Sequence, residues 1–244
     1  MGLNFKEICD IISPRISKIP TTWDGKKSIL EMKAEGGRWK DMEWIGFYFE
    51  LLCKKNLSGV VEMPYSKKYG NVSFDGFLEC PWDFKAHAIQ SKEDIIINDS
   101  EAISNAVKDF GYMGLIIVTG PVVYDNESED FKKWHDDLKG KKSKYELDRI
   151  ARGVPPRRRK ISMKISKILF IKIDDELLIK TGSFQKNFRN QNGSARREKV
   201  SLNPKEAEKN AQFVLEINET VSMKESFMIV IKLLFNKIIG TLNK

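Results

Sequence analysis

Residues 71–89 read NVSFDGFLECPWDFKAHAI, and the predicted fold is built around this stretch. Apolar and polar residues alternate along 71–79 and again along 82–89, a pattern typical of strands that bury one face. Only Cys80 and Pro81 separate the two runs. We therefore expect two neighbouring antiparallel strands joined by a short corner at these two residues.

This hairpin gathers two carboxylates and an amine. Residues two apart on a strand point to the same face, so Asp83 and Lys85 should project together while Phe84 points to the core. Asp75, in the middle of the first strand, should meet them across the turn. Converging carboxylates repel each other and are costly to bury, but their oxygens are ligands that Mg²⁺ prefers. The residues predict a Mg²⁺ site at which Lys85 orients or deprotonates a water molecule that attacks phosphorus.

The segments around the hairpin complete a core over residues 39–120. Helical spacing of apolar residues predicts a helix over 39–57, and 60–63 is a candidate strand. A helix is expected over 100–110, and the continuous apolar run GLIIVT, 114–119, predicts a buried central strand. The expected fold class is α/β, with a mixed central β-sheet flanked by helices.

Outside this core the pattern is less regular. We treat residues 1–244 as a single domain in which 121–244 elaborate the core. The further elements that we expect are a helix over Asn4–Ile19 kinked or broken at Pro14, a helix over Ser128–Arg152, strands over Lys164–Ile173 and Leu177–Ile179, a polar loop over Thr181–Asn203, and helices starting at Pro204 and over Ser222–Leu242.

Composition restricts the class of protein. The chain has 244 residues, with 42 Lys and Arg against 34 Asp and Glu, and three widely spaced cysteines. The cysteines offer neither a disulfide framework nor a zinc motif, and the N-terminus lacks the features of a signal peptide. The stretch 227–239 contains two lysines, so it is not expected to span a membrane. We expect a cytoplasmic protein.

Positive charge is concentrated in two segments. Residues 139–160 carry ten Lys and Arg against two acids, and 180–209 carry eight against three. Such local concentration is typical of proteins that bind a phosphate backbone. A solvated surface in a lysine-rich protein would give the same composition, so this alternative stays open.

The pattern Asp75, then Asp83-x-Lys85 on the next strand, resembles the active site of the PD-(D/E)XK nuclease superfamily, in the form found in many type II restriction endonucleases. Its core is a helix, a three-stranded antiparallel meander, a helix and a further strand, the order expected over 39–120. The sequence departs from the motif at Phe74, which stands where the family's name has proline. The resemblance implies a restriction-endonuclease-like core, Mg²⁺ bound by Asp75, Asp83 and the main-chain carbonyl of Phe84, and a DNA-binding and dimerisation elaboration over 121–244.

Families of this kind often add a carboxylate from the preceding helix. Glu43 and Glu50 lie seven residues apart and therefore on one face of that helix. Glu43 is the first choice as a catalytic residue and Glu50 the second; a partly exposed helix edge is the alternative explanation for both. His87 shares the strand face of Lys85 and is a candidate to approach the phosphate, although core or surface packing is its default role.

Three groups of residues are candidates for contacts with DNA. Asn and Gln can pair with adenine and Arg with guanine, while Lys and Arg neutralise phosphates. Each group also has an alternative interpretation without DNA: an N-terminal turn for the group before the first core helix, a flexible linker for the group after the double proline, and a mobile loop for the third group. The candidates are Arg38 and Lys40 before the first core helix; Arg157, Arg158 and Arg159 after a double proline; and Gln185, Lys186, Asn187, Arg189, Asn190, Asn192, Arg196 and Arg197 in the polar loop.

The function that these residues imply is Mg²⁺-dependent, sequence-specific hydrolysis of double-stranded DNA by a type II restriction endonuclease. The resemblance implies products with 5′-phosphate ends. A homodimer would match the two-fold symmetry of a palindromic site. Two alternatives remain: a repair or structure-specific nuclease of the same superfamily, and a DNA-binding protein without catalytic activity.

Overall fold

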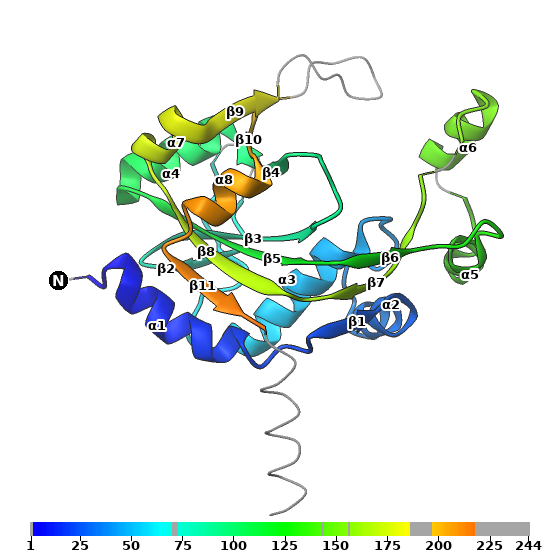
Figure 1. Ribbon diagram of the computed structural model, residues 1–244, viewed down its shortest axis with the longest axis horizontal. Coiled ribbons are helices and arrows are strands. Elements are labelled where there is room, and N and C mark those ends of the chain that lie inside the picture. Colours follow the sequence, from blue (N-terminus) through cyan, green and yellow to red (C-terminus); the bar gives the residue numbers. More distant parts are fainter. Residues whose placement is uncertain (1, 70–72, 143, 156, 186–196, 218–244) are drawn as a thin grey trace, which may run out of the picture.

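The structure is a computed structural model that describes residues 2–69, 73–142, 144–155, 157–185 and 197–217. It is mixed α/β, as expected (Figure 1). Its helices are α1 (Phe5–Ile16), α2 (Gly25–Ala34), α3 (Trp44–Leu57), α4 (Ser100–Phe110), α5 (Asp130–Lys139), α6 (Lys144–Ala151), α7 (Asp175–Thr181) and α8 (Pro204–Lys209). Its strands are β1 (Thr22–Asp24), β2 (Gly76–Leu78), β3 (Cys80–Ala88), β4 (Ile95–Asp99), β5 (Met113–Gly120), β6 (Val122–Tyr124), β7 (Lys160–Lys164), β8 (Lys167–Ile173), β9 (Gly182–Gln185), β10 (Lys199–Leu202) and β11 (Phe213–Glu216).

The five-stranded central sheet has the order β11-β8-β5-β3-β2. Strands β3 and β5 pair in parallel, whereas the other neighbours pair antiparallel. The side chains of β5 are almost all buried, which confirms the predicted central strand. Strands β8 and β11 come from the second half of the chain, so residues 121–244 also contribute to the central sheet.

The two faces of this sheet face different hydrophobic clusters. Ile116 and Val118 of β5 pack into the cluster that includes α1, α2 and α3. Leu115 and Ile117 point the other way, to a cluster that includes α4, β4 and β10. Each fully buried aliphatic side chain stabilises the fold by about 1.5–3 kcal/mol. The alternation of β5 therefore fixes a three-layer arrangement, with the sheet in the middle.

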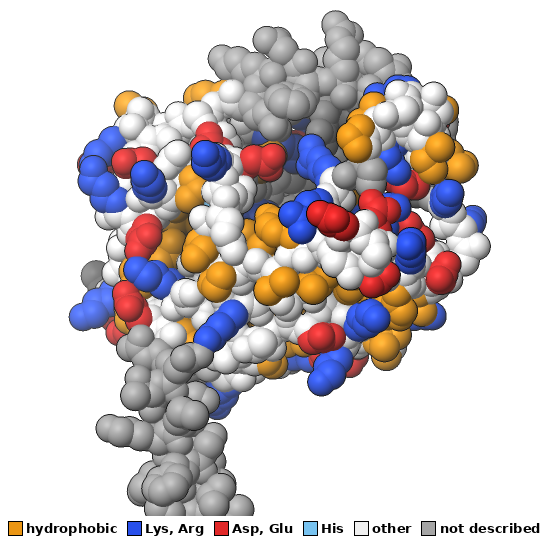
Figure 2. Space-filling view, turned by 45° about the vertical axis from the view of Figure 1, so that its right-hand side comes forward, with side chains coloured by type: hydrophobic (Ala, Val, Ile, Leu, Met, Phe, Trp, Pro, Cys, Tyr) orange, Lys and Arg blue, Asp and Glu red, His pale blue; other side chains and the backbone are white. Residues whose placement is uncertain are grey.

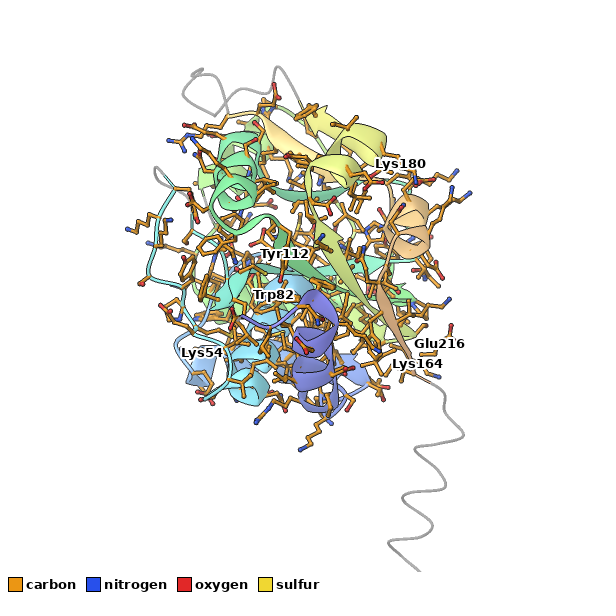
Figure 3. The ribbon with its side chains drawn as sticks, turned by 90° about the vertical axis from the view of Figure 1, so that its left-hand side faces the viewer. Lys54, Trp82, Tyr112, Lys164, Lys180 and Glu216 are labelled. Carbon is orange, nitrogen blue, oxygen red and sulfur yellow. The ribbon has the colours of Figure 1, made fainter. Side chains whose placement is uncertain are left out.

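Helix α1 belongs to the layer that also contains α2 and α3. Asn4 caps it in a capping box with Glu7, and the helix continues through Pro14, where we expected a kink or break. Phe5 at its start stacks on Trp82 of β3 and meets the edge of Tyr112, next to β5. Figure 3 shows Trp82 and Tyr112 beside this helix.

Some predicted elements differ from the structure because local capping decides them. Residues Leu177–Ile179 are helical, not a strand, because Asp174 caps α7 by accepting a hydrogen bond from the backbone N–H of Leu177 at 3.0 Å. The single helix predicted over Ser128–Arg152 is two helices, because α5 ends at Gly140, which is in the left-handed region at φ 74°.

The other differences concern strands. Residues 60–63 contribute only a bridge from Glu62 to Phe77. The strand predicted over 164–173 corresponds to β8, which begins at Lys167, while Lys164 ends the separate strand β7. The polar loop predicted over 181–203 contains β9 and β10 at its ends. Elements that sequence reasoning missed are β1, α2, β4, β6 and β11. The helix predicted over 222–242 lies outside the described residues.

Candidate active site

The site begins just before strand β2. This strand is three residues long, from Gly76 to Leu78, and the chain turns at Glu79, one residue before the expected corner. Asp75 therefore stands just before β2 and not in mid-strand as predicted. Its backbone N–H donates to the carbonyl of Trp82 at 2.9 Å, and its Oδ2 accepts from the N–H of Phe84 at 2.7 Å.

The side chain of Asp75 thus accepts the hydrogen bond from β3 that a backbone carbonyl would accept if β2 were longer. Beyond Trp82, no described strand pairs with this edge of β3. The N–H and C=O of one residue in a strand point to the same edge, so the carbonyl of Phe84 also faces this open edge, next to Asp75. The strands separate at the point where sequence analysis predicts a Mg²⁺ site.

Asp83 and Lys85 project together from β3, as predicted. Phe84 points the other way and packs edge-on against Phe49 of α3, with ring centroids 6.1 Å apart. Lys85 Nζ lies 3.5 Å from Asp83 Oδ2, and the two side chains are 25% and 2% exposed. The ion pair is therefore largely removed from solvent, where charge interactions are strong.

Sequence analysis missed a residue that holds Asp83 in place. Asn98 of β4 donates a hydrogen bond from Nδ2 to Asp83 Oδ2 at 3.1 Å, and its own Oδ1 accepts from the N–H of Asp99 at 2.9 Å. Both residues end the apolar run of β4, IIIND. Polar residues at the end of a buried run were the available signal, but the sequence does not show that β4 lies against β3.

The electrostatics of the cluster favour an added cation. Burial raises the pKa of Asp83 to about 7 and is only partly opposed by Lys85, while Asp75 raises it further. Burial also raises the pKa of Asp75. For Lys85, burial lowers the pKa, but Asp83, Asp75 and Glu50 together outweigh it and raise the pKa. One ammonium thus faces several carboxylates.

Glu50, and not the first choice Glu43, belongs to this cluster. Burial and then the charge of Asp75 raise the pKa of Glu50 to about 7; Lys85 and Arg38 oppose this rise, and Asp83 adds to it. Glu43 precedes α3, is 55% exposed at its side chain and pairs with Lys160 Nζ at 2.7 Å. Glu43 lies outside the helix, so it does not share a helical face with Glu50 as predicted.

The donor set suits a small hard cation. Asp75 and Asp83 each use Oδ2 in hydrogen bonds, and the other oxygen, Oδ1, has no hydrogen-bond partner among the described residues. Mg²⁺ is usually held by one or two carboxylates together with water and substrate phosphate. A group of three or more His, Cys, Asp or Glu that could hold a metal is not found in the described part of the chain. Asp75, Asp83 and the carbonyl of Phe84 therefore fit Mg²⁺ bound jointly with a phosphate, but not a metal held by protein side chains alone.

His87 follows Lys85 on the same face of β3. Its Nε2 is buried and has no hydrogen-bond partner within the described ranges. Burial, and then the charge of Lys160, lower its pKa, so the ring is neutral at pH 7. His135, in contrast, is a core residue: it is 1% exposed, and its Nε2 lies 2.8 Å from the carbonyl of Trp39.

Of the candidates for DNA contacts, those before α3 and after Pro155 are described. Arg38 pairs with Asp41 at 2.9 Å and lies over the ring of Phe47. Lys40 and Arg157 line one cavity, together with the buried Arg159, whereas Arg158 donates to the carbonyl of Asp125.

The candidates from the polar loop are only partly described. Gln185 ends β9. Arg197 approaches Asp99 at 3.6 Å, which ties the end of the loop to the strand that carries Asn98. The predicted DNA contacts that lie outside the described residues are Lys186, Asn187, Arg189, Asn190, Asn192 and Arg196.

Lys and Arg side chains border a hollow on the face drawn in Figure 2. In Figure 1, the small sheet β4-β10-β9 and the helices α5 and α6 stand at opposite ends of the same side of the central sheet. The open edge of β3 belongs to that sheet. The described parts of the two basic segments, in α5 and α6 and in β9 and β10, therefore lie at two ends of one side of the sheet.

Comparisons with known proteins do not identify a relative. No protein-family model, no curated protein and no solved structure matches the chain. Among the described helices, none combines the length and apolarity needed to cross a membrane.

Proposed function

We propose that the protein is a Mg²⁺-dependent endonuclease that hydrolyses phosphodiester bonds in double-stranded DNA, as type II restriction endonucleases do. The observation that carries the proposal is the convergence of Asp75, Asp83, Lys85 and Glu50 at the open edge of β3. Four ionisable side chains from three segments are costly to bury together. Such clusters with perturbed pKa values are typical of catalytic sites.

The order of elements also supports a restriction-endonuclease-like core. Helix α3 precedes the bridge at Glu62, which pairs with Phe77 of β2, and β2 pairs antiparallel with β3. Helix α4 then leads to β5, which is parallel to β3. This is the sequence of helix, three antiparallel segments, helix and strand that the resemblance implies, with both acidic motifs where the second and third segments meet.

The chemistry follows from the surroundings of each side chain. Mg²⁺, when bound, would neutralise phosphate charge and lower the pKa of a bound water. Lys85 stays protonated at neutral pH because of its carboxylate neighbours, so it would donate to a phosphate oxygen and stabilise the charge that develops there. Glu50, with a pKa near 7, is suited to accept a proton from the attacking water. Asn98 would keep Asp83 oriented.

DNA is the substrate that fits the basic segments. The charged loop that ends at Arg197 would read bases in the major groove, and Arg157 and Arg158 would contact the backbone. A homodimer would place two such sites on the two strands of a palindrome.

The proposal is tested by incubating the purified protein with phage DNA in Mg²⁺ and in EDTA. We expect discrete fragments with Mg²⁺ and intact DNA with EDTA. A smear of fragments would favour a nuclease without sequence specificity, such as a repair enzyme. Intact DNA in both reactions, with retained DNA binding, would favour the non-catalytic alternative and overturn the proposal.

A further inference from the structure

A cavity of about 690 Å³ lies apart from the carboxylate cluster. It is formed by the chain before α3, the C-terminal part of α5, helix α6 and the segment that leads into β7. Its volume is within the range of pockets that hold small-molecule ligands, about 300–1,000 Å³. None of Asp75, Asp83, Lys85 or Glu50 lines it.

The lining of this cavity is strongly basic. Eight Lys and Arg side chains face three acidic ones. Two of the acids pair with bases of the same lining: Asp136 with Lys139 at 3.1 Å and Glu146 with Arg149 at 2.6 Å. The third, Asp41, pairs with Arg38. Of the other six cations, Arg159 acts on Glu146 and lowers its pKa. Among the described residues, the other five form no ion pair with a carboxylate of the lining; they are Lys40, Lys141, Lys142, Arg152 and Arg157.

Arg159 indicates what the cavity binds. The residue is only 8% exposed, yet its Nε and Nη1 are buried and have no hydrogen-bond partner among the described residues. A guanidinium presents N–H groups in a planar fork that matches the oxygens of a phosphate. Burying an ion without partners costs several kcal/mol. An anion held in the cavity would offset the charge of this guanidinium.

The backbone holds Arg159 at the cavity. Its carbonyl accepts a hydrogen bond from the N–H of Asp125 at 2.8 Å, and β7 begins at the next residue. Apolar side chains of Met42, Val154 and Pro155 complete the wall. The cavity therefore combines a cationic part with a smaller apolar part, as a ligand with a phosphate and an organic group requires.

We propose that this cavity binds a nucleoside phosphate, with the phosphate on Arg159. The nucleoside phosphate comes either from a free nucleotide or from a strand of nucleic acid. The assignment is independent of the proposed nuclease activity, because it uses no residue of the carboxylate cluster.

The test measures binding of ATP and, separately, of a 20-base-pair DNA duplex, to the full-length protein in EDTA by calorimetry and fluorescence anisotropy. The variants are Arg159→Met and, as a control with the same change of charge, Arg15→Met on the exposed side of α1. Because two buried nitrogens of Arg159 have no hydrogen-bond partner among the described residues, we expect Arg159→Met to melt at the same or a higher temperature than the unmodified protein.

At least tenfold weaker binding of ATP to Arg159→Met, with Arg15→Met unchanged within twofold, would support a free nucleotide as the ligand. The same loss for the duplex alone, with a shallower salt dependence, would support a nucleic-acid strand. Unchanged affinity of Arg159→Met for both probes, or absence of binding to either, would overturn the proposal. If Arg159→Met does not fold, the exposed cavity residues Lys141 and Lys142, both replaced by Gln, provide the same comparison.

Discussion

Asp75 Oδ2 accepts a hydrogen bond from the backbone N–H of Phe84 at 2.7 Å. One carboxylate thereby completes the strand pairing of the hairpin and stands at the open edge of β3. The proposed metal ligand also terminates the pairing of β2 with β3. Its structural and catalytic roles can be separated by substitution.

Asp75→Ala removes both the acceptor and the charge, whereas Asp75→Asn keeps an acceptor oxygen. We expect Asp75→Ala to lower the free energy of unfolding by about 1–3 kcal/mol, because the N–H of Phe84 loses its partner. Asp75→Asn should be as stable as the unmodified protein, measured by urea denaturation in EDTA. Both variants should lose Mg²⁺-dependent cleavage. Asp75→Asn with full cleavage activity would exclude Asp75 as a metal ligand.

The two glutamates of the first core helix give a matched pair of variants. Glu50→Gln should reduce the cleavage rate at least a hundredfold, because Glu50 lies with Asp75 and Lys85, and a positioned acid or base contributes 10²–10⁴-fold. Glu43→Gln should stay within threefold, since Glu43 only pairs with Lys160 near the surface. Single-turnover rates on a plasmid measure both. A larger loss for Glu43→Gln would reverse the assignment.

Asn98 is expected to act as a positioning residue through Asp83. Asn98→Ala should lower the cleavage rate about 10–100-fold, the usual effect of removing a residue that orients a metal ligand. It should also raise the Mg²⁺ concentration required for half-maximal activity, a shift that a general loss of stability does not produce. The titration is performed well below the melting temperature of the variant. An unchanged Mg²⁺ dependence would show that Asn98 does not act on the metal site.

His135 makes a separate prediction about stability and pH. Burial, and next the charge of Lys139, lower the pKa of His135 to about 4. The unfolded chain, with a histidine pKa near 6.5, binds a proton that the folded protein excludes, so the contribution of His135 is complete above pH 6.5 and is lost as the pH falls toward 4. When the pH is lowered from 7 to 5, the free energy of unfolding of the unmodified protein should fall by about 2 kcal/mol more than that of His135→Gln, since one pKa unit corresponds to about 1.4 kcal/mol.

Urea denaturation at pH 7 and pH 5 measures this difference. Gln at this position can still donate to the carbonyl of Trp39, so the variant changes titration more than packing. Equal losses for the two proteins would show that His135 is protonated without cost in the folded state.

The fold around the hairpin could be predicted because its signals are local. The buried run of β5 and the alternation that separates Phe84 from Asp83 and Lys85 both follow from side-chain periodicity. The end of α5 at Gly140 and the start of α7 at Asp174 were missed, because capping overrides the propensities of the flanking residues. Strand β4 was missed because it is short and belongs to a second sheet, so its partners are distant in sequence.

The site shows the same limit. Asp83 and Lys85 were placed together by strand geometry alone, and the structure brings them to 3.5 Å. The choice between Glu43 and Glu50 depends on how α3 lies against the sheet, and helical spacing cannot decide it. Asn98 requires the packing of β4 on β3. The buried state of Arg159 likewise follows from tertiary structure and not from its place in a run of arginines.

The central claim is that Lys85 and the carboxylates around it hydrolyse a phosphodiester bond with Mg²⁺. The most direct measurement compares single-turnover cleavage of a plasmid by the unmodified protein, by Lys85→Met and by Lys92→Met, an exposed lysine seven residues further along the chain. With Mg²⁺ present, we predict that Lys85→Met cleaves at least a thousandfold more slowly while it still binds DNA, and that Lys92→Met cleaves at the unmodified rate. Cleavage by Lys85→Met at the unmodified rate would contradict the account.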